Sequence, residues 1–153
     1  MSGRGAAESD EDPVGEYETR SAAETEALGS MIASGLVAGD VVVIGGEIGA
    51  GKTTLIRGAC RRLGVTEAIT SPTFTIGHTY AGRVPVSHLD LYRLEALESE
   101  DPALLEDYLT PDSIAFIEWP GLAEPHLSSG SLRVELDHAG ADRRSVRVSR
   151  LGT

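Results

Sequence analysis

Short runs of consecutive apolar residues occur at two places in the chain. Residues 41–44 read VVVI and residues 113–117 read SIAFI. A run of this length that is rich in β-branched residues is typical of a strand buried on both faces, as in the centre of a parallel sheet. Residues 132–137 and 146–148 alternate instead between apolar and polar, which predicts half-buried strands. The apolar pattern therefore predicts a sheet with a fully buried centre.

Two helices are predicted beside these strands. Ser21 and Glu24 form a capping-box pattern, and apolar residues follow at helical spacing until about Gly35. A second helix is expected after the glycine-rich segment at 46–53, running through about Leu63 with Gly64 as its C-cap. These alternating strands and helices predict an α/β fold.

Two further features complete the element prediction. Residues 73–80 and 83–91 are predicted to be strands that form a hairpin around Ala81-Gly82. A short helix is expected over residues 102–109. The hairpins should extend a sheet whose central strands are parallel.

The segment between the first buried strand and the second helix carries the strongest chemical signal. Residues 46–53 read GEIGAGKT and match the phosphate-loop pattern G-x-x-x-x-G-K-[ST]. Glycines let successive backbone N–H groups point at phosphate oxygens, and the helix that follows adds its positive N-terminus. The pattern predicts that Lys52 reaches the β- and γ-phosphates and that the Thr53 hydroxyl binds Mg²⁺. Together with the elements, it predicts a P-loop NTPase-like three-layer sandwich with a mixed sheet.

The basic residues support this assignment of Lys52. The chain has 13 Lys and Arg residues, and twelve of them are Arg, so Lys52 is its single lysine. A compact ammonium on a flexible stem suits a phosphate site. A chain that otherwise uses Arg on its surface gives little reason for a lysine elsewhere.

Hydrolysis needs a carboxylate near the phosphates, and two strand ends offer one. Asp90 closes the predicted strand 83–91, and Glu118 follows the buried strand 113–117. Each is a candidate for Mg²⁺ binding or for orienting the attacking water. An ordinary strand-end Asp and a solvated Glu are the alternative interpretations.

Other positions are more ambiguous. Trp119 either packs beside the nucleotide or belongs to the core, and the hydroxyls at 70–73, including Thr73, form either a γ-phosphate-sensing loop or a plain loop. His78 and His88 lack the spacing of a metal site and are expected to be structural. Cys60 is expected to be a small core residue.

Charge and composition limit the setting of the protein. The formal net charge is −11, which argues against direct binding of bare nucleic acid. Residues 1–15 are acidic and polar and are predicted to be a disordered tail ahead of a domain at 16–153. No apolar run is long enough to cross a membrane, and the N-terminus does not resemble a secretory signal. With a single cysteine, these features favour the cytoplasm.

Four motifs together resemble the TsaE family, formerly called YjeE. They are GEIGAGKTT at 46–54, SPTF at 71–74, HLDLYR at 88–93 and EWP at 118–120, and the resemblance covers roughly residues 16–151. It implies an ATPase of the tRNA threonylcarbamoyladenosine pathway that acts with TsaB and TsaD. tRNA would be reached through that complex.

The resemblance also implies roles for particular residues. The phosphates of ATP or ADP would be held by Gly49, Ala50, Gly51, Lys52, Thr53 and Thr54, with Thr73 nearby. Mg²⁺ would be bound by Thr53, Asp90 and Glu118, and the catalytic residues would be Lys52, Asp90 and Glu118. Trp119 would lie at the nucleotide, and Ser21 and Ala22 would lie near the adenine.

Other nucleotide-dependent functions are weighed against this one. A GTPase would need an Asn-Lys-x-Asp element, and the chain contains no Asn. A P-loop small-molecule kinase would need an Arg-rich lid and an acceptor pocket, for which the sequence gives no sign. A nucleotide-gated interaction module that does not hydrolyse ATP differs only in turnover, so it remains an alternative.

Overall fold

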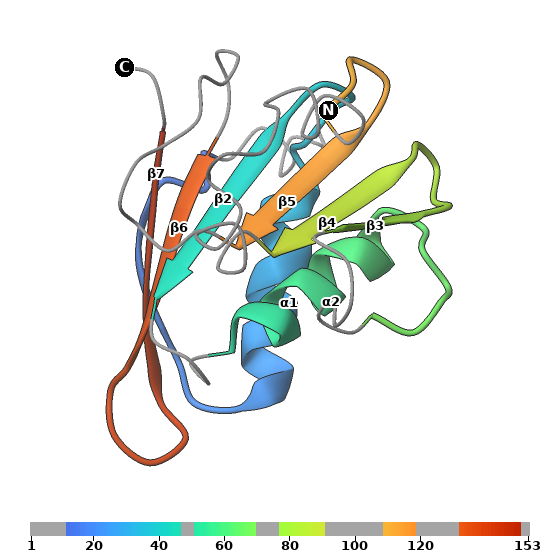
Figure 1. Ribbon diagram of the computed structural model, residues 1–153. Coiled ribbons are helices and arrows are strands. Elements are labelled where there is room, and N and C mark those ends of the chain that lie inside the picture. Colours follow the sequence, from blue (N-terminus) through green and yellow to red (C-terminus); the bar gives the residue numbers. More distant parts are fainter. Residues whose placement is uncertain (1–11, 47–50, 70–76, 91–108, 119–131, 151–153) are drawn as a thin grey trace, which may run out of the picture.

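The computed structural model describes residues 12–46, 51–69, 77–90, 109–118 and 132–150. These residues form one mixed sheet with two helices (Figure 1). The helices are α1 (Ala22–Ala33) and α2 (Lys52–Arg62). The strands are β1 (Gly15–Thr19), β2 (Val41–Gly46), β3 (Gly77–Tyr80), β4 (Val86–Asp90), β5 (Ile114–Glu118), β6 (Leu132–His138) and β7 (Arg144–Arg150).

The strand order across the described sheet is β1-β7-β6-β2-β5-β4-β3. β2 is parallel to both β5 and β6, and β4 is parallel to β5. The outer pairs β3–β4, β6–β7 and β1–β7 are antiparallel. The predicted parallel centre with antiparallel hairpins is therefore confirmed.

β2 is buried on both of its faces, as its apolar run predicts. Val42 and Ile44 belong to the core cluster that contains residues of both helices. Val41 and Val43 point to the opposite face, because side chains alternate along a strand, and they are also buried. The described helices pack on one face only, so the described elements make two layers of the predicted three-layer sandwich. The helix expected at 102–109 lies almost wholly outside the described residues.

α1 begins as its capping box predicts. The Ser21 hydroxyl accepts a hydrogen bond from the Glu24 backbone N–H at 3.1 Å, and the Glu24 carboxylate accepts one from the Arg20 N–H at 2.7 Å. The helix ends at Ala33, close to the expected Gly35. These two hydrogen bonds fix the residue at which α1 begins.

β1 was absent from the sequence-based prediction. It is a five-residue edge strand paired with β7, and its Glu16 and Glu18 are exposed, so its apolar signal is weak. It begins one residue before the predicted domain start at residue 16. Residues ahead of the strand also contact the domain. Asp12 forms an ion pair with Arg150 at 2.8 Å, and the Tyr17 hydroxyl donates to the Pro13 carbonyl at 2.7 Å. Of the predicted disordered tail at 1–15, residues 1–11 lie outside the described residues, and residues 12–15 make the contacts and the strand start given above.

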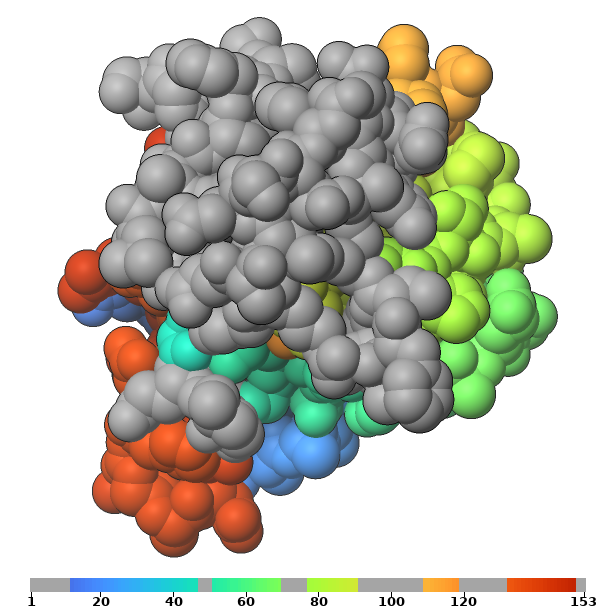
Figure 2. Space-filling view, in the orientation of Figure 1, coloured from blue at the N-terminus to red at the C-terminus, as the bar shows by residue number. Residues whose placement is uncertain are grey.

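The two hairpins lie far apart in the molecule. The turn between β6 and β7 protrudes beside α1, on the side away from the β3–β4 hairpin (Figure 2). The carboxyl ends of β2, β4 and β5 lie at one edge of the sheet because these strands are parallel. In open α/β sheets this edge is where ligands bind.

Candidate functional site

The described ends of the phosphate loop are shaped by two glycines. Gly46 closes β2 with a φ of +132°, and a Cβ there would stand 1.9 Å from the Leu136 carbonyl oxygen. Gly51 is the N-cap of α2 in the left-handed conformation, with a φ of +99°. Residues with a side chain rarely adopt these positive φ angles, so glycine is needed at both positions. Between them, residues 47–50 lie outside the described structure.

Lys52 is the first residue of α2, and it is buried. Its Nζ donates a hydrogen bond to the Gly46 carbonyl oxygen at 3.1 Å, so the ammonium lies beside the last residue of β2. Thr53 and Thr54 follow in the first helical turn. The N-cap of α2 is Gly51, which has no side chain and makes no side-chain cap hydrogen bond.

The two predicted carboxylates end neighbouring parallel strands. Asp90 on β4 is the register partner of Glu118 on β5, and Glu118 also pairs with Ile44 on β2. Residues in register have side chains on the same face of the sheet. That face carries Phe116 and Ile44, which pack in the core against the helices. Asp90 and Glu118 therefore lie side by side on the face that α2 covers.

The charges of these residues act on one another. Burial lowers the pKa of Lys52, and the carboxylates of Glu118 and Asp90 oppose that effect by stabilising the ammonium. The structure therefore brings together three residues that the sequence singled out from separate segments. A cationic group flanked by two carboxylates can bind a phosphate chain together with a divalent cation.

Glu118 has a partner that the sequence did not reveal. His88 Nε2 lies 2.7 Å from Glu118 Oε2, and both side chains are buried. His88 was expected to be structural because it lacks metal-ligand spacing. Its position two residues before Asp90 places it on the same face of β4, and that alternation was the available signal.

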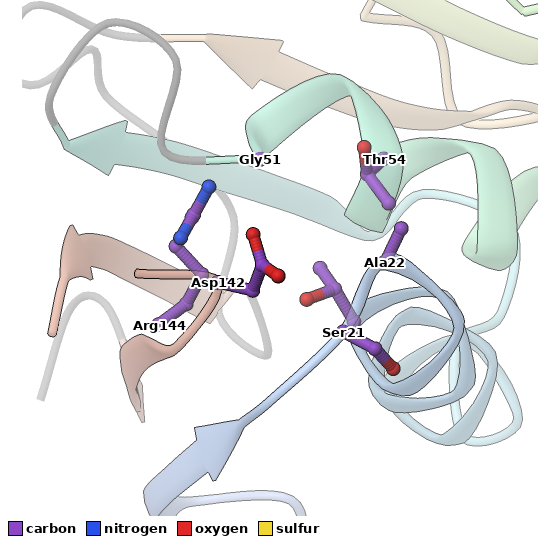
Figure 3. Close-up of a pocket in the computed structure, with 7 residues that line it drawn as sticks. Ser21, Ala22, Gly51, Thr54, Asp142 and Arg144 are labelled. Atoms are coloured by element: carbon purple, nitrogen blue, oxygen red, sulfur yellow. The ribbon is translucent and has the colours of Figure 1, made fainter. Parts of the chain in front are cut away.

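A pocket of about 340 Å³ opens beside the start of α2 (Figure 3). Ser21, Ala22 and Thr25 of the α1 region line one side, and Gly51 and Thr54 line another. The predicted nucleotide residues Ser21, Ala22, Gly51 and Thr54 are therefore brought together.

Two further residues complete this pocket, Asp142 of the turn between β6 and β7 and Arg144, the first residue of β7. Figure 3 shows both side chains facing the opening from the side opposite α1. The sequence did not suggest these residues, because a hairpin turn gives no local sign of where its tip lies in the fold.

Four predicted site residues lie outside the described part of the chain. They are Gly49, Ala50, Thr73 and Trp119. Within the described part, no group of three or more His, Cys, Asp or Glu residues is arranged to hold a metal ion. The two carboxylates and the Thr53 hydroxyl still suit Mg²⁺, which is commonly bound by one or two carboxylates together with substrate phosphates. No described helix is long and apolar enough to cross a membrane.

Comparison with known proteins identifies the family. The model of the family described as "Threonylcarbamoyl adenosine biosynthesis protein TsaE" matches residues 19–146. A protein from Bacillus subtilis named tRNA threonylcarbamoyladenosine biosynthesis protein TsaE is 38% identical over 130 residues, covering 84% of this chain and 81% of its own. A protein of the same name from Streptomyces coelicolor is 40% identical, covering 82% of this chain and 89% of its own.

A solved structure agrees with these relatives. The crystal structure of YdiB from Bacillus subtilis superposes with a TM-score of 0.73 at 30% identity, covering 90% of this chain and 85% of that one. The resemblance inferred from the four motifs is thereby confirmed. The chain belongs to the TsaE family, whose relatives named here are tRNA threonylcarbamoyladenosine biosynthesis proteins.

Proposed function

We propose that this protein is the Mg²⁺-dependent ATPase subunit of tRNA threonylcarbamoyladenosine biosynthesis, acting with TsaB and TsaD in the cytoplasm. The observation that carries the proposal is the placement of Asp90 and Glu118 in register beside the buried ammonium of Lys52. Family membership supplies the pathway. The fold supports a nucleotide site at the edge where its central parallel strands end.

Lys52 is the residue that would hold the phosphates. Its ammonium donates to the Gly46 carbonyl at 3.1 Å, and phosphate oxygens are stronger acceptors that would draw it from there. Gly51 precedes α2 in the left-handed conformation, and the N-terminus of the helix that follows favours bound anions. The phosphates would thus meet both an ammonium and the positive end of a helix.

Thr53, Asp90 and Glu118 are the oxygen donors that fit Mg²⁺. The ion, when bound, would neutralise charge on the β- and γ-phosphate oxygens. The chain contains no Gln, so the water-orienting role that Gln fills in Ras-like sites falls to another group. Glu118 is suited to that role because its carboxylate is buried and hydrogen-bonded. Because one carboxylate would then both bind Mg²⁺ and orient the attacking water, we expect slow turnover without partners.

The pocket beside α2 is proposed to take the nucleoside part of ATP. Its volume lies within the usual range for small-ligand sites, and it adjoins the helix start that would hold the phosphates. Ser21, Ala22 and Thr54 would contact the base or ribose, and Asp142 would accept hydrogen bonds from it. Trp119 is also proposed to lie at the nucleotide.

The net charge of −11 makes a direct contact with tRNA unfavourable. tRNA is therefore proposed to be reached through TsaB and TsaD, and ATP hydrolysis to reset that complex.

Binding and turnover of ATP test the proposal. Calorimetry should detect Mg²⁺-ATP binding, and the emission of Trp119, the only tryptophan, should change with it. Hydrolysis should be slow alone and faster with TsaB and TsaD. Lys52→Met should weaken ATP binding by about 10- to 100-fold, since a charge-assisted hydrogen bond contributes about 1.5–3 kcal/mol.

The same assays separate the alternatives. Transfer of phosphate to a small-molecule acceptor in preference to water would indicate a kinase. Tight binding without turnover, with or without the partners, would indicate a nucleotide-gated interaction module. Unchanged ATP binding by Lys52→Met would reject the phosphate-loop assignment.

A further inference from the structure

His88 lies on β4, a strand in the interior of the sheet, and it contacts Glu118 of the proposed catalytic centre. Its side chain is completely buried, and its register partner on β5 is Phe116. Glu118 stands two residues further along β5, so the imidazole reaches it diagonally, with Nε2 2.7 Å from Oε2. Asp90, two residues after His88, lies directly beside Glu118. His88 thus contacts the proposed catalytic carboxylate from the interior of the sheet, two residues before the end of β4.

The stability of the fold does not explain a histidine at this position. The other ring nitrogen, Nδ1, is buried and has no hydrogen-bond partner among the residues that the structure describes. An imidazole that donates from Nε2 and carries no second proton leaves Nδ1 as an acceptor, and an unsatisfied buried acceptor destabilises a fold. An apolar residue beside Phe116 would avoid that cost. The polar contact to Glu118 is the feature that an apolar residue would lose.

The contact with His88 restricts the rotamers of the Glu118 side chain. A free glutamate side chain samples several rotamers, and holding it in one costs conformational entropy. The N–H of His88 fixes Oε2 and leaves Oε1 to the site. Carboxylates that bind metal ions are commonly held by hydrogen bonds of this kind.

We propose that His88 is a positioning residue whose Nε2–H holds the Glu118 carboxylate in the orientation needed for ATP hydrolysis. The proposal rests on the proposed function, because it assigns a task to Glu118. His88 would act through Glu118 and would not itself contact nucleotide or metal.

Two substitutions separate positioning from packing. His88→Leu fills the space without a donor, whereas the amide of His88→Gln places an N–H where Nε2 lies. In the ATPase assay with TsaB and TsaD, His88→Leu should lower kcat by about 10- to 100-fold. Its ATP affinity should stay within about threefold, and its melting temperature should match or exceed that of the parent. His88→Gln should have a kcat clearly higher than that of His88→Leu and closer to that of the parent.

A second measurement does not depend on turnover. Nitrogen-15 NMR of the histidine rings should show His88 as a single tautomer protonated at Nε2, with slow exchange of that proton. Glu118→Leu should abolish the slow exchange and leave the signals of His78 and His138 unchanged.

Specific outcomes overturn the positioning role. If the parent hydrolyses ATP and His88→Leu does so equally fast, or if His88→Gln is no better than His88→Leu, His88 does not position Glu118. A ring protonated at Nδ1 alone would also overturn it. If the parent shows no turnover at all, the proposed function fails, and the ring-proton measurement then decides by itself whether the contact exists.

Discussion

At the scale of single residues, Glu118 interacts with two of the other residues singled out above. It is a buried carboxylate that accepts a hydrogen bond from His88 and helps to stabilise the Lys52 ammonium. A group used mainly in the transition state affects turnover more than ground-state binding. This separates it from Lys52, whose loss should weaken ATP binding itself.

Glu118→Gln is expected to bind ATP nearly as well as the parent and to hydrolyse it about 100-fold more slowly. That factor corresponds to roughly 2.7 kcal/mol of lost transition-state stabilisation. The amide oxygen can still accept from His88, so the fold should be unaffected. Calorimetry and steady-state kinetics with TsaB and TsaD make the comparison. Parent-like turnover by Glu118→Gln would remove this residue from the catalytic role.

Cys60 behaves as a core residue, as expected from the sequence. It is fully buried on α2, and burial raises the pKa of its thiol to about 12. An unfolded cysteine has a pKa of about 8.5. Below that value both states keep the proton. Above it only the unfolded chain releases the proton, so the free energy of unfolding falls as pH rises toward 12.

Iodoacetamide should therefore fail to label Cys60 in the native protein at pH 8 and should label it fully in urea. The thiolate is the reactive form, and it is neither formed nor accessible in the fold. Mass spectrometry measures the labelling, with Cys60→Ser as the blank. Rapid native labelling would mean that α2 opens readily.

At the scale of elements, the crossing of α1 and α2 depends on two glycines. A Cβ on Gly29 would stand 2.0 Å from the Leu55 carbonyl oxygen, and a Cβ on Gly58 would stand 2.0 Å from that of Glu26. Each helix thus presses a glycine against the backbone of the other. Because α1 carries Ala22 and α2 carries Thr54, this close crossing sets the width of the pocket between them.

Gly58→Ala is expected to destabilise the protein by about 1–3 kcal/mol. Alanine normally stabilises a helix interior by about 1 kcal/mol relative to glycine, but here the new methyl group meets backbone that cannot move aside. Thermal unfolding should show a melting temperature lower by several degrees. Arg61→Ala, on an exposed position near the end of the same helix, should change stability by less than about 0.5 kcal/mol. A more stable Gly58→Ala would contradict the close crossing.

At the scale of the whole molecule, the N-terminal segment tests where the domain begins. Deleting residues 2–11 is expected to leave melting temperature and ATP affinity nearly unchanged, as the predicted disordered tail requires. Deleting residues 2–14 removes the Pro13 carbonyl that accepts from the Tyr17 hydroxyl, so it should cost about 1 kcal/mol. Neither deletion should alter the proposed ATP site, whose described residues lie outside residues 2–14.

Thermal unfolding and calorimetry of the two shortened chains measure both effects. A large stability loss from removing residues 2–11 would show that the tail packs on the domain. A loss of ATP affinity alone would place the tail at the nucleotide.

Local sequence by itself determined the parts of this protein that depend on neighbouring residues. The capping box at Ser21, the buried strand at β2 and the glycine-rich turn into α2 follow from spacing over a few residues. The motifs that gave the family are equally local. β1 was missed because an edge strand with exposed Glu16 and Glu18 carries little apolar signal.

Tertiary structure decided what joins distant segments. His88 and Glu118 are 30 residues apart, and only the parallel register of β4 and β5 puts the imidazole beside the carboxylate. The pocket likewise needs the Asp142 turn, more than a hundred residues after Ala22, to fold back beside α1. Such contacts depend on how strands order and pair across the whole sheet, and neither propensity nor spacing along the chain specifies that order.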